Sequence, residues 1–229
     1  MRTYSVLICD DNKFVHQSLT PYFEREGVTA VSVYDGEAAL KAARSRKFDL
    51  IILDIMLPKM FGTDVCREIR KFSEVPIMML SAKGEELDRI VGLELGADDY
   101  VTKPFSPREV ALRVRSILRR AKGSKVGGAM TLGKLTVNPK AYSVRIGDET
   151  VKMTPREVEL LAFLMERRGE VASREDILDS VWGENYCGDV RAVDTLLARV
   201  RGKIPAEEAG VEFHTVYGVG YMIDESKEK

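Results

Sequence analysis

Short apolar runs alternate with segments of helical spacing through the first half of the chain, and this alternation restricts the folds it can adopt. The strand-like runs are Ser5–Cys9, Thr29–Val33, Leu50–Leu53, Pro76–Leu80 and Asp99–Val101. The helical segments between and after them are Phe14–Glu26, Glu37–Ser45, Asp64–Lys71, Glu86–Leu95 and Pro107–Arg120. Continuous apolar runs suit strands buried on both faces, and parallel strands are joined by right-handed helical crossovers. Residues 1–121 are therefore predicted to form a (βα)5 doubly wound α/β domain with a parallel sheet.

The pattern changes after residues 122–129, a small, polar and glycine-rich segment that is typical of a linker. Threonine, proline and glutamate in Met153-Thr-Pro-Arg-Glu157 predict a helix start with a capping box. Short β segments precede this helix at Leu135–Asn138, Ser143–Ile146 and Glu149–Lys152. Two helices follow it, at Arg174–Val181 and Arg191–Ile204, and then a β-hairpin of Glu212–Val216 and Tyr221–Asp224. Residues 130–226 are therefore predicted to form a second, α+β domain.

Composition narrows the class of protein. The 229 residues are 45% hydrophobic and 31% charged, as in ordinary soluble globular proteins with one or two domains. No apolar run approaches the ~18 residues of a membrane span, so we expect a cytoplasmic protein without membrane contact. The three cysteines and two histidines are too scattered to indicate a disulfide framework, a zinc site or a histidine-rich metal site: Cys9, Cys66, Cys187, His16 and His214.

Polar side chains stand where the predicted strands end. Asp10 and Asp11 follow the first run, Asp54 ends the third, Ser81 ends the fourth and Lys103 follows the fifth. The carboxyl ends of parallel strands line one ligand crevice, so these groups are expected to converge. Three carboxylates at one rim raise one another's pKa unless a cation lies among them, and Mg²⁺ takes oxygen ligands and bridges to phosphate. A carboxylate can also accept a phosphoryl group, so the pattern predicts a magnesium-dependent phosphoryl-transfer site.

A structural explanation exists for each residue alone. An aspartate after a strand is most often a helix cap or a turn residue, and Asp11 could cap the helix that begins near Lys13. Five suitable residue types at the ends of the strands, in order, are hard to obtain by chance. We therefore favour the functional interpretation of the set.

At this point a family resemblance is evident, because residues 1–121 resemble a response-regulator receiver domain of flavodoxin- or CheY-like fold. The matching motifs are Cys9-Asp-Asp-Asn12, Leu53-Asp-Ile-Met-Leu-Pro58, Ser81-Ala82 and Asp98-Asp-Tyr-Val-Thr-Lys-Pro-Phe105. The resemblance implies that Asp54 is the phosphoacceptor, with Ser81 and Lys103 binding its phosphoryl group and a cis peptide bond after Lys103. It implies Mg²⁺ ligands at Asp10, Asp11, Asp54 and the Met56 main-chain carbonyl. One departure is Phe61 before Gly62, where the family more often has an acidic or polar residue.

The resemblance also implies a switch and a dimer. Ser81 and Tyr100 would form the switch pair, with the Tyr100 ring turning inward when the hydroxyl of Ser81 binds the phosphoryl group. In the family, charged residues of the fourth helix, fifth strand and fifth helix pair across a two-fold axis. The pairs expected here are Arg89–Glu109, Asp99–Arg113 and Asp98–Arg120. A solvated surface is the alternative explanation of these charges, because exposed pairs contribute only ~0–1 kcal/mol.

The second domain resembles the winged helix-turn-helix effector of OmpR/PhoB-type regulators over nearly all of Leu132–Asp224. The matching motifs are Met153-Thr-Pro-Arg-Glu-Val-Glu-Leu-Leu161, Ser173-Arg-Glu-Asp-Ile-Leu178, Val181-Trp-Gly183, Val190-Arg-Ala-Val-Asp-Thr195 and Gly218-Val-Gly-Tyr221. For Trp182 a role in the core is favoured over a phosphate contact. The predicted recognition helix, Arg191–Ile204, has an apolar stripe of Val193, Leu197, Val200 and Ile204.

The opposite face of that helix is expected to enter the major groove of DNA. We expect base contacts from Thr195 and Arg199 and phosphate contacts from Arg191 and Arg201. A solvated helix surface is the alternative for the arginines. Tyr217 stands in the wing turn, where many relatives place an arginine that enters the minor groove.

Charge argues against tight DNA binding by a single copy. From Gly128 to Lys229 there are 14 lysines and arginines against 18 aspartates and glutamates, a net charge of −4. DNA-binding domains are normally basic, because neutralising phosphates supplies much of the affinity. We therefore expect useful affinity only from two copies on repeated half-sites, coupled by the receiver dimer.

The sequence as a whole predicts a transcription regulator, not a metabolic enzyme. A sensor histidine kinase would phosphorylate Asp54, the receiver would dimerise, and paired winged helices would bind promoter DNA; RNA polymerase is a further candidate partner. Two alternatives are kept. A haloacid-dehalogenase-type phosphatase needs a second aspartate two residues after the nucleophile, where this chain has Met56. A regulator that acts mainly through protein contacts, with little DNA affinity, fits the acidic second domain.

Overall fold

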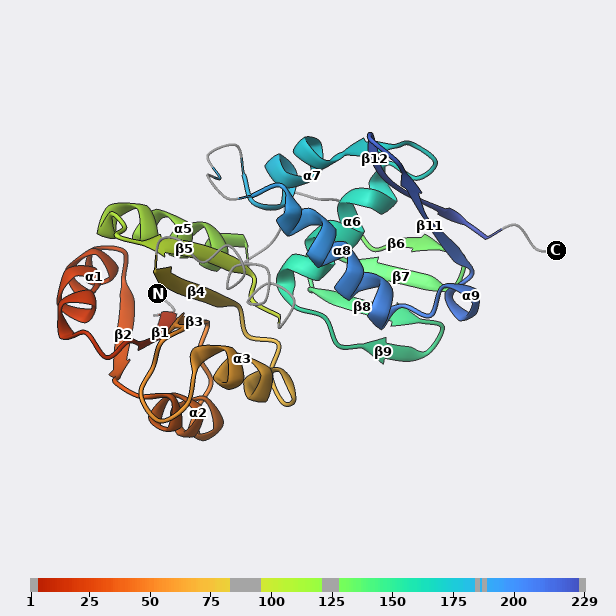
Figure 1. Cartoon of the computed structure of the whole chain (residues 1–229). Helices are drawn as coiled ribbons and strands as arrows, with labels where there is room; N and C mark the ends of the chain where they lie inside the picture. The colour runs from red at the N-terminus through yellow and green to blue at the C-terminus, as the bar shows by residue number, and fades with distance from the viewer. Residues whose placement is uncertain (1–3, 83–95, 121–127, 184–185, 187–188, 227–229) are drawn as a thin grey trace. The chain divides into compact units, whose positions relative to one another are not determined.

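The computed structural model divides into two compact units, Met1–Arg120 and Ala121–Lys229 (Figure 1). It describes residues 4–82, 96–120, 128–183, 186 and 189–226. The predicted helix Glu86–Leu95 and all but the last two residues of the predicted linker lie outside these ranges. Among the described residues, no helix combines the length and the hydropathy that a membrane crossing requires.

The first unit is the predicted α/β domain. Its strands form one parallel sheet in the order β2-β1-β3-β4-β5. The elements are β1 (Tyr4–Cys9), α1 (Lys13–Arg25), β2 (Val28–Val33), α2 (Gly36–Ser45), β3 (Leu50–Asp54), α3 (Gly62–Arg70), β4 (Ile77–Ala82), β5 (Asp99–Lys103) and α5 (Pro107–Arg120). The strand order reverses direction beside β1, so the edge formed by the carboxyl ends of β1 and β3 is the switch point where ligands of such sheets bind.

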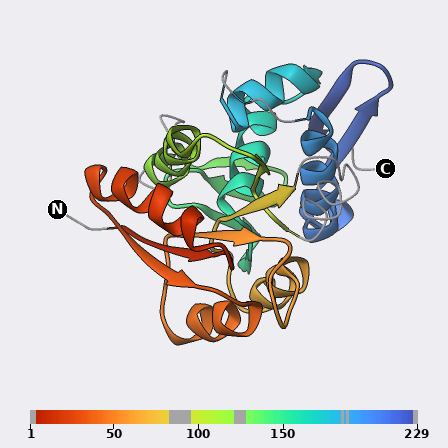
Figure 2. The same cartoon turned by 60° about the vertical axis from the view of Figure 1, so that its left-hand side comes forward.

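Alternation along the strands builds a core on each face of this sheet. Val6 and Ile8 of β1 pack with α1 and α5, whereas Leu7 and Cys9 pack with α2 and α3. Figure 2 shows helices on both sides of the sheet. Because both faces are covered, the central strands β1, β3 and β4 carry continuous apolar runs, as the sequence indicated, whereas β2 and β5 also contain polar residues. Polar groups at the carboxyl ends of these strands lie at the edge of the sheet, where they can be hydrated or paired.

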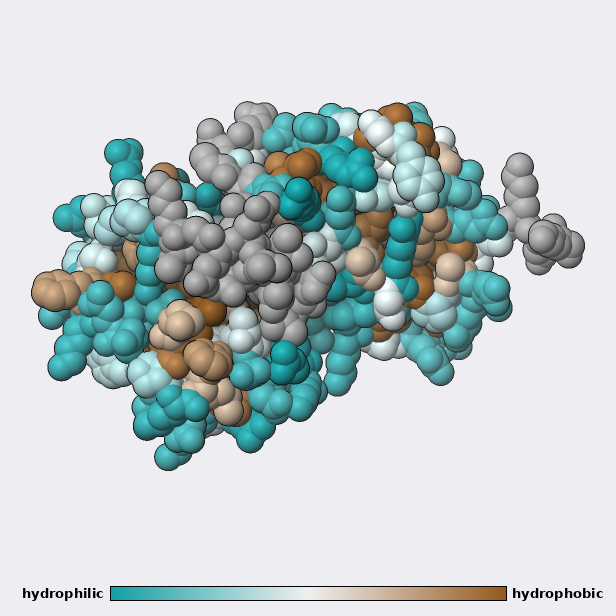
Figure 3. All heavy atoms as spheres, in the orientation of Figure 1, coloured by the Kyte–Doolittle hydropathy of each residue, from teal (hydrophilic) through white to brown (hydrophobic). Residues whose placement is uncertain are grey.

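The loop that follows β3 lies at the surface. Met56 is 59% exposed and Phe61 53% exposed, and Phe72 at the end of α3 is also exposed. Brown and tan side chains gather over this region in Figure 3, whereas teal dominates most of the visible surface. The carboxyl end of β3 is therefore within reach of a molecule in solution.

The second unit is a winged helix. It contains a four-stranded antiparallel sheet, β6-β7-β8-β9, and a three-stranded sheet, β10-β12-β11. The elements are β6 (Met130–Leu132), β7 (Leu135–Asn138), β8 (Ser143–Ile146), β9 (Glu149–Val151), α6 (Pro155–Glu166), β10 (Ala172–Ser173), α7 (Arg174–Val181), α8 (Arg191–Lys203), α9 (Ala206–Ala209), β11 (Val211–Val216) and β12 (Gly220–Glu225). The sequence analysis missed β6, β10 and α9, which are too short to show a period.

Helix α6 is the centre of this unit. It begins with the predicted capping box, in which the side chain of Thr154 accepts from the Glu157 N–H and that of Glu157 accepts from the Thr154 N–H. Most residues of α6 are buried. Trp182 is only 7% exposed and lies against Arg156, with 5.4 Å from the guanidinium carbon to the ring centroid. The predicted core role of Trp182 therefore agrees with its placement.

Candidate functional site

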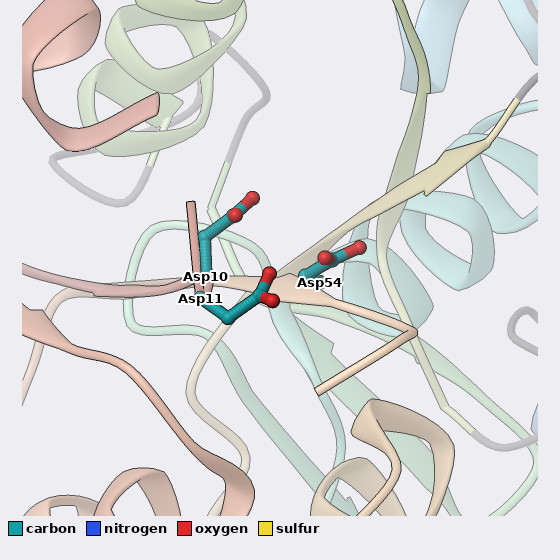
Figure 4. Close-up of side chains that lie close together, drawn as sticks. All are labelled: Asp10, Asp11 and Asp54. Carbon is teal, nitrogen blue, oxygen red and sulfur yellow. The ribbon is translucent and has the colours of Figure 1, made fainter. Parts of the chain in front are cut away.

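Three carboxylates meet at the carboxyl edge of the first sheet. Asp10 and Asp11 directly follow β1 and Asp54 ends β3, and these two strands are neighbours with Cys9 paired to Leu53. One carboxylate oxygen from each aspartate lies within 4.8 Å of the others. Figure 4 shows the three carboxyl groups on the same side of the strand ends. Asp10 and Asp54 are buried and Asp11 is exposed, so the cluster is open to solvent on the Asp11 side.

Lys103 joins this cluster from two strands away. Its Nζ lies 2.7 Å from Asp10 Oδ2 and 3.0 Å from Asp54 Oδ2. Burial disfavours the ammonium, but the hydrogen bonds to Asp10 and Asp54 outweigh it, and the pKa of Lys103 is raised. Burial raises the pKa of Asp54, and the bond from Lys103 opposes that rise. Lys103 therefore stays charged and holds the two buried carboxylates together.

The donor set fits a hard divalent cation. Three ionised carboxylates and one ammonium carry a net charge of −2, which a single divalent ion balances. All the candidate ligands on these side chains are oxygens, and one of the three carboxylates is accessible from solvent. Mg²⁺ takes such ligands and keeps several waters. The acidic cluster could therefore hold a metal ion, whereas the additional ligand expected from the Met56 main-chain carbonyl stays a prediction.

The loop after β3 positions Asp54. The Met56 N–H donates to the Asp54 carboxylate, and the Gly62 N–H donates to the Ile55 carbonyl over 2.8 Å. A Cβ at position 62 would lie 1.9 Å from the Asp54 carbonyl oxygen, which no side chain tolerates. Glycine is therefore required where α3 begins, and the preceding Phe61 is exposed over about half of its surface.

Ser81 and Tyr100 lie on the strands beside Asp54. Ser81 follows Leu80, the residue of β4 that pairs with Asp54, and is only 2% exposed. Tyr100 in β5 pairs with Met79 and is buried in the core on the α2 and α3 face. The Tyr100 ring thus has an inward position, as one state of the predicted switch requires. The Lys103–Pro104 peptide bond is cis, as the resemblance implied.

The sequence analysis missed His16 as a part of this site. Its Nε2 lies 2.8 Å from the Asp10 carbonyl oxygen and its Nδ1 lies 2.8 Å from Ser32 Oγ. The ring also packs on Tyr34, at 4.7 Å between centroids. His16 therefore fixes the backbone that presents Asp10. Its position on the buried face of α1, between Val15 and Leu19, was the available signal.

The charges expected at a dimer interface are engaged within the chain. Asp98 is 1% exposed, pairs with Arg70 at 2.8 Å and accepts the Ile77 N–H, contrary to the expected partnership with Arg120. Asp99 pairs with Arg113 of the same chain at 3.2 Å, and Arg113 also pairs with Glu109. The side chains of Arg89 and Arg120 lie outside the described part of the chain. Asp98 lies just before β5 and turns to Arg70 of α3, whereas Asp99, the first residue of β5, turns to Arg113 of α5.

Helix α8 turns two of its predicted DNA contacts inward. Arg199 is 13% exposed and its Nη2 lies 2.9 Å from Glu157 Oε1, so it cannot reach a base in this arrangement, contrary to the expectation. Arg201 donates from Nη2 to the Phe213 carbonyl and to Thr215 Oγ1, which engages it with β11 and not with a phosphate. Arg191 is exposed and Thr195 half-buried, both on the outer face. Tyr217 in the turn between β11 and β12 is 92% exposed.

The sequence analysis assigned Glu157 only to the capping box at the start of α6, but its carboxylate also forms ion pairs. It is completely buried, and it accepts from Arg199 and from Lys203 Nζ at 2.7 Å. Burial works against its carboxylate, but the charges of Arg199 and Lys203 outweigh burial and lower its pKa. The capping glutamate therefore also fixes the predicted recognition helix against α6.

Comparison with known proteins supports the same division of the chain. Residues 6–115 match the family model of the response regulator receiver domain, and residues 148–223 match that of the transcriptional regulatory protein, C terminal. The alkaline phosphatase synthesis transcriptional regulatory protein PhoP of Bacillus subtilis is 40% identical over 97% of this chain and 97% of its own length.

Solved structures with both domains are similar as well. A mutant of RitR matches with a TM-score of 0.75 and 25% identity over 97% of this chain and all of its own. The response regulator DrrB of Thermotoga maritima, an OmpR/PhoB homologue, matches with a TM-score of 0.52 and 29% identity over the same shares. With the acidic site in its first unit and a winged helix as its second, this chain belongs to the OmpR/PhoB family of two-component response regulators, which are DNA-binding transcription regulators.

Proposed function

We propose that the chain is a transcription regulator that a sensor histidine kinase activates by phosphorylating Asp54. The observation that carries the proposal is the Lys103 ammonium, which touches both Asp10 and Asp54 at the open carboxyl edge of the sheet. An acceptor carboxylate, a cation beside it and two further acidic groups are the parts that phosphoryl transfer to an aspartate needs.

The residues of the chain have distinct tasks in this reaction. An Asp54 carboxylate oxygen forms a bond to phosphorus while the bond from phosphorus to the imidazole nitrogen of the kinase's phosphohistidine breaks, and the freed imidazole takes up a proton. Lys103 stays charged and can turn from Asp54 to the incoming phosphoryl oxygens. Mg²⁺, held by Asp10, Asp11, Asp54 and the Met56 carbonyl, would supply positive charge beside those oxygens. Asp10 is kept in place by Lys103 and by the His16 contact to its backbone.

Phosphorylation would act through Ser81 and Tyr100. The added charge of about −2 attracts the Ser81 hydroxyl, which would donate to a phosphoryl oxygen. Movement of the β4 end would favour the inward position of the Tyr100 ring over an outward one. We infer that this shift alters the surface formed by β5 and α5 and favours pairing of two receivers. Glu109 lies on that surface and pairs with Arg113, which also pairs with the buried Asp99, and these contacts would be exchanged between copies.

Paired effectors would then bind repeated half-sites in promoter DNA. Arg191 and Thr195 on the outer face of α8 and Tyr217 at the wing tip are the proposed contacts. The net charge of −4 from Gly128 to Lys229 predicts weak binding by one copy, and linking two copies raises the effective concentration of the second. RNA polymerase is the partner through which bound regulator would alter transcription.

A second candidate function is regulation mainly through protein contacts. The inward placement of Arg199 and Arg201 favours it, because these cations do not add to a DNA-binding surface. Footprinting on upstream DNA with and without acetyl phosphate separates the two functions. The proposal expects protection of paired sites that depends on acetyl phosphate and is lost in Asp54→Asn. Absence of protection under both conditions would favour the protein-contact function.

A further inference from the structure

Two of the three clustered carboxylates belong to adjacent residues, Asp10 and Asp11, which a single peptide group joins (Figure 4). A peptide group is planar, so its orientation determines how the chain leaves Asp10 and how it enters Asp11. Rotating this group would move the two carboxylates relative to each other and to Asp54. A contact that fixes the peptide group therefore also fixes part of the geometry of the acidic cluster.

His16 makes such a contact from the buried face of α1. Its Nε2 lies 2.8 Å from the Asp10 carbonyl oxygen, and the residue is only 5% exposed. A carbonyl oxygen can only accept, so Nε2 carries the hydrogen and donates it. Without this donor, the buried carbonyl of Asp10 would gain free energy by turning toward water, and the peptide group would turn with it.

Ser32 orients the imidazole ring of His16. Ser32 lies on the edge strand β2, where it pairs with Ile8 of β1, and its Oγ lies 2.8 Å from His16 Nδ1. A hydroxyl can donate to Nδ1 or accept from it, so this contact persists in either protonation state of the ring. The ring of Tyr34 packs against the imidazole, at 4.7 Å between centroids. Both contacts favour the ring orientation in which Nε2 faces Asp10.

The other polar groups of Asp10 are engaged as well. Its N–H donates to the Val33 carbonyl over 3.2 Å, its Oδ1 accepts the Asn12 N–H over 2.9 Å, and its Oδ2 accepts from Lys103 over 2.7 Å. The bond from His16 differs from the one made by Lys103, because it reaches the backbone and not a carboxylate. Substituting His16 therefore perturbs the peptide group and leaves the charges of the cluster unchanged.

We propose that Ser32 and His16 are positioning residues that set how tightly the acidic cluster binds its divalent cation. Ser32 orients the ring, the ring holds the peptide group, and the peptide group places the carboxylates of Asp10 and Asp11 relative to each other. Groups that orient metal ligands in this indirect way typically change metal affinity 10–100-fold when they are removed. This inference rests on the proposed phosphorylation site and identifies residues that tune it.

Two substitutions of His16 separate the two bonds of its ring. Glutamine carries its amide near the position of Nε2 and can still donate to the Asp10 carbonyl. Asparagine carries its amide near the position of Nδ1 and can reach only Ser32. Both variants place an uncharged amide at the same buried position, so a general loss of packing affects both. We expect His16→Asn to weaken binding of the cation about tenfold and His16→Gln to weaken it less than about threefold.

Binding is measured on the full-length protein with Mn²⁺, which takes octahedral oxygen ligands as Mg²⁺ does. Electron paramagnetic resonance detects the free Mn²⁺, and competition with Mg²⁺ gives the affinity for that ion. Each variant is titrated below its thermal transition, so unfolding does not contribute. Ser32→Ala should weaken binding by less than His16→Asn. Ser18→Ala is the matched control, because its hydroxyl donates to the Val15 carbonyl within α1, and it should keep the affinity of the unaltered protein.

Phosphorylation by acetyl phosphate gives a second measurement. In His16→Asn, the Mg²⁺ concentration for half-maximal rate should rise by the same factor as the dissociation constant. The rate at saturating Mg²⁺ should stay within about threefold of normal, because the acceptor Asp54 and Lys103 are unchanged. A lower rate at saturating Mg²⁺ with an unchanged half-maximal concentration would contradict a role in metal affinity.

Two further results would overturn the inference. Equal Mn²⁺ affinities in His16→Asn and His16→Gln would show that the bond to Asp10 does not set the affinity. A loss in Ser18→Ala as large as that in Ser32→Ala would remove the role of Ser32. Both results would leave the proposed function standing if Asp54 of the unaltered protein is phosphorylated. The expected order of Mn²⁺ affinities without phosphorylation of Asp54 would instead support the inference and refute the proposed function, and absence of Mn²⁺ binding by the unaltered protein would refute both.

Discussion

Glu157→Gln is expected to destabilise the winged helix without changing its shape. Glutamine has the same volume and can still accept the Thr154 N–H, so the helix start is preserved. Its amide nitrogen, however, replaces one of the two oxygens that now bind Arg199 and Lys203. The two cations then face a neutral group that can satisfy only one of them.

The magnitude follows from the burial of the three groups. Removing one partner of a fully buried ion pair costs about 3–5 kcal/mol, because the remaining charge is uncompensated. Glu157 is fully buried, but the side chains of Arg199 and Lys203 are 13% and 31% exposed and can recover part of their hydration. We therefore expect a loss of about 2–3 kcal/mol in the free energy of unfolding of this unit.

Tryptophan fluorescence in urea measures this loss in the full-length protein. The chain has one tryptophan, Trp182, and it is buried in the winged helix, so its emission reports that unit alone. At an m-value of about 1.5 kcal/mol/M, the midpoint should fall by about 1–2 M urea. Glu166→Gln, at the exposed end of the same helix, is the matched control and should change stability by less than about 0.5 kcal/mol.

A double-mutant cycle makes the test stricter. When Arg199→Gln is already present, Glu157→Gln should cost about 1–2 kcal/mol less than it does alone, because the contact is already broken. The reasoning would be refuted if Glu157→Gln unfolded at the same urea concentration as Glu166→Gln, or if the costs of the two substitutions were additive. Either result would mean that the carboxylate does not hold α8.

Three further predictions concern the two sites. Gly62→Ala should lower the stability of the receiver by about 3 kcal/mol or more in thermal denaturation followed by circular dichroism, because its Cβ would meet the Asp54 carbonyl oxygen; an unchanged melting temperature would contradict this. Lys103→Ala should slow phosphorylation by acetyl phosphate about 10²-fold, measured by intact mass, and a rate within threefold of normal would exclude the proposed role. The lowered pKa of Glu157 stabilises the winged helix fully above its ordinary value of 4.5, and this contribution is lost as the pH falls through the lower folded value. At pH values below about 4.5, the urea concentration at the unfolding midpoint should therefore decrease in the unaltered protein, and decrease less in Glu157→Gln. Parallel pH profiles of the two midpoints would argue against this contribution of Glu157.

The arrangement of the acidic site could be predicted from sequence because a parallel sheet fixes where strands end. Asp10 and Asp54 follow apolar runs, and buried neighbouring strands must place such residues at one edge. The position of His16 on the buried face of α1 could be predicted, but its contact with the Asp10 carbonyl could not, because that contact depends on how α1 packs.

The ion-pair partners of the charged residues on α5 and α8 were harder to predict, because these partners are distant in sequence. Arg199 lies on the flank of the apolar stripe of α8, and only the packing of α6 places Glu157 beside it. Asp98 and Asp99 are adjacent in sequence, yet they turn to Arg70 on α3 and to Arg113 on α5. Helical spacing identifies the buried face of a helix, but it does not predict which residues at the border of that face form buried ion pairs.

The proposed function depends most directly on covalent phosphorylation of Asp54. The measurement is the intact mass of the purified full-length protein after incubation with Mg²⁺ and acetyl phosphate, followed by peptide mapping. We expect a mass increase of one phosphoryl group, located in the peptide that contains Asp54 and lost in Asp54→Asn and on removal of Mg²⁺ with a chelator. An unmodified mass, or a phosphoryl group that persists in Asp54→Asn to the same extent, would contradict the central claim.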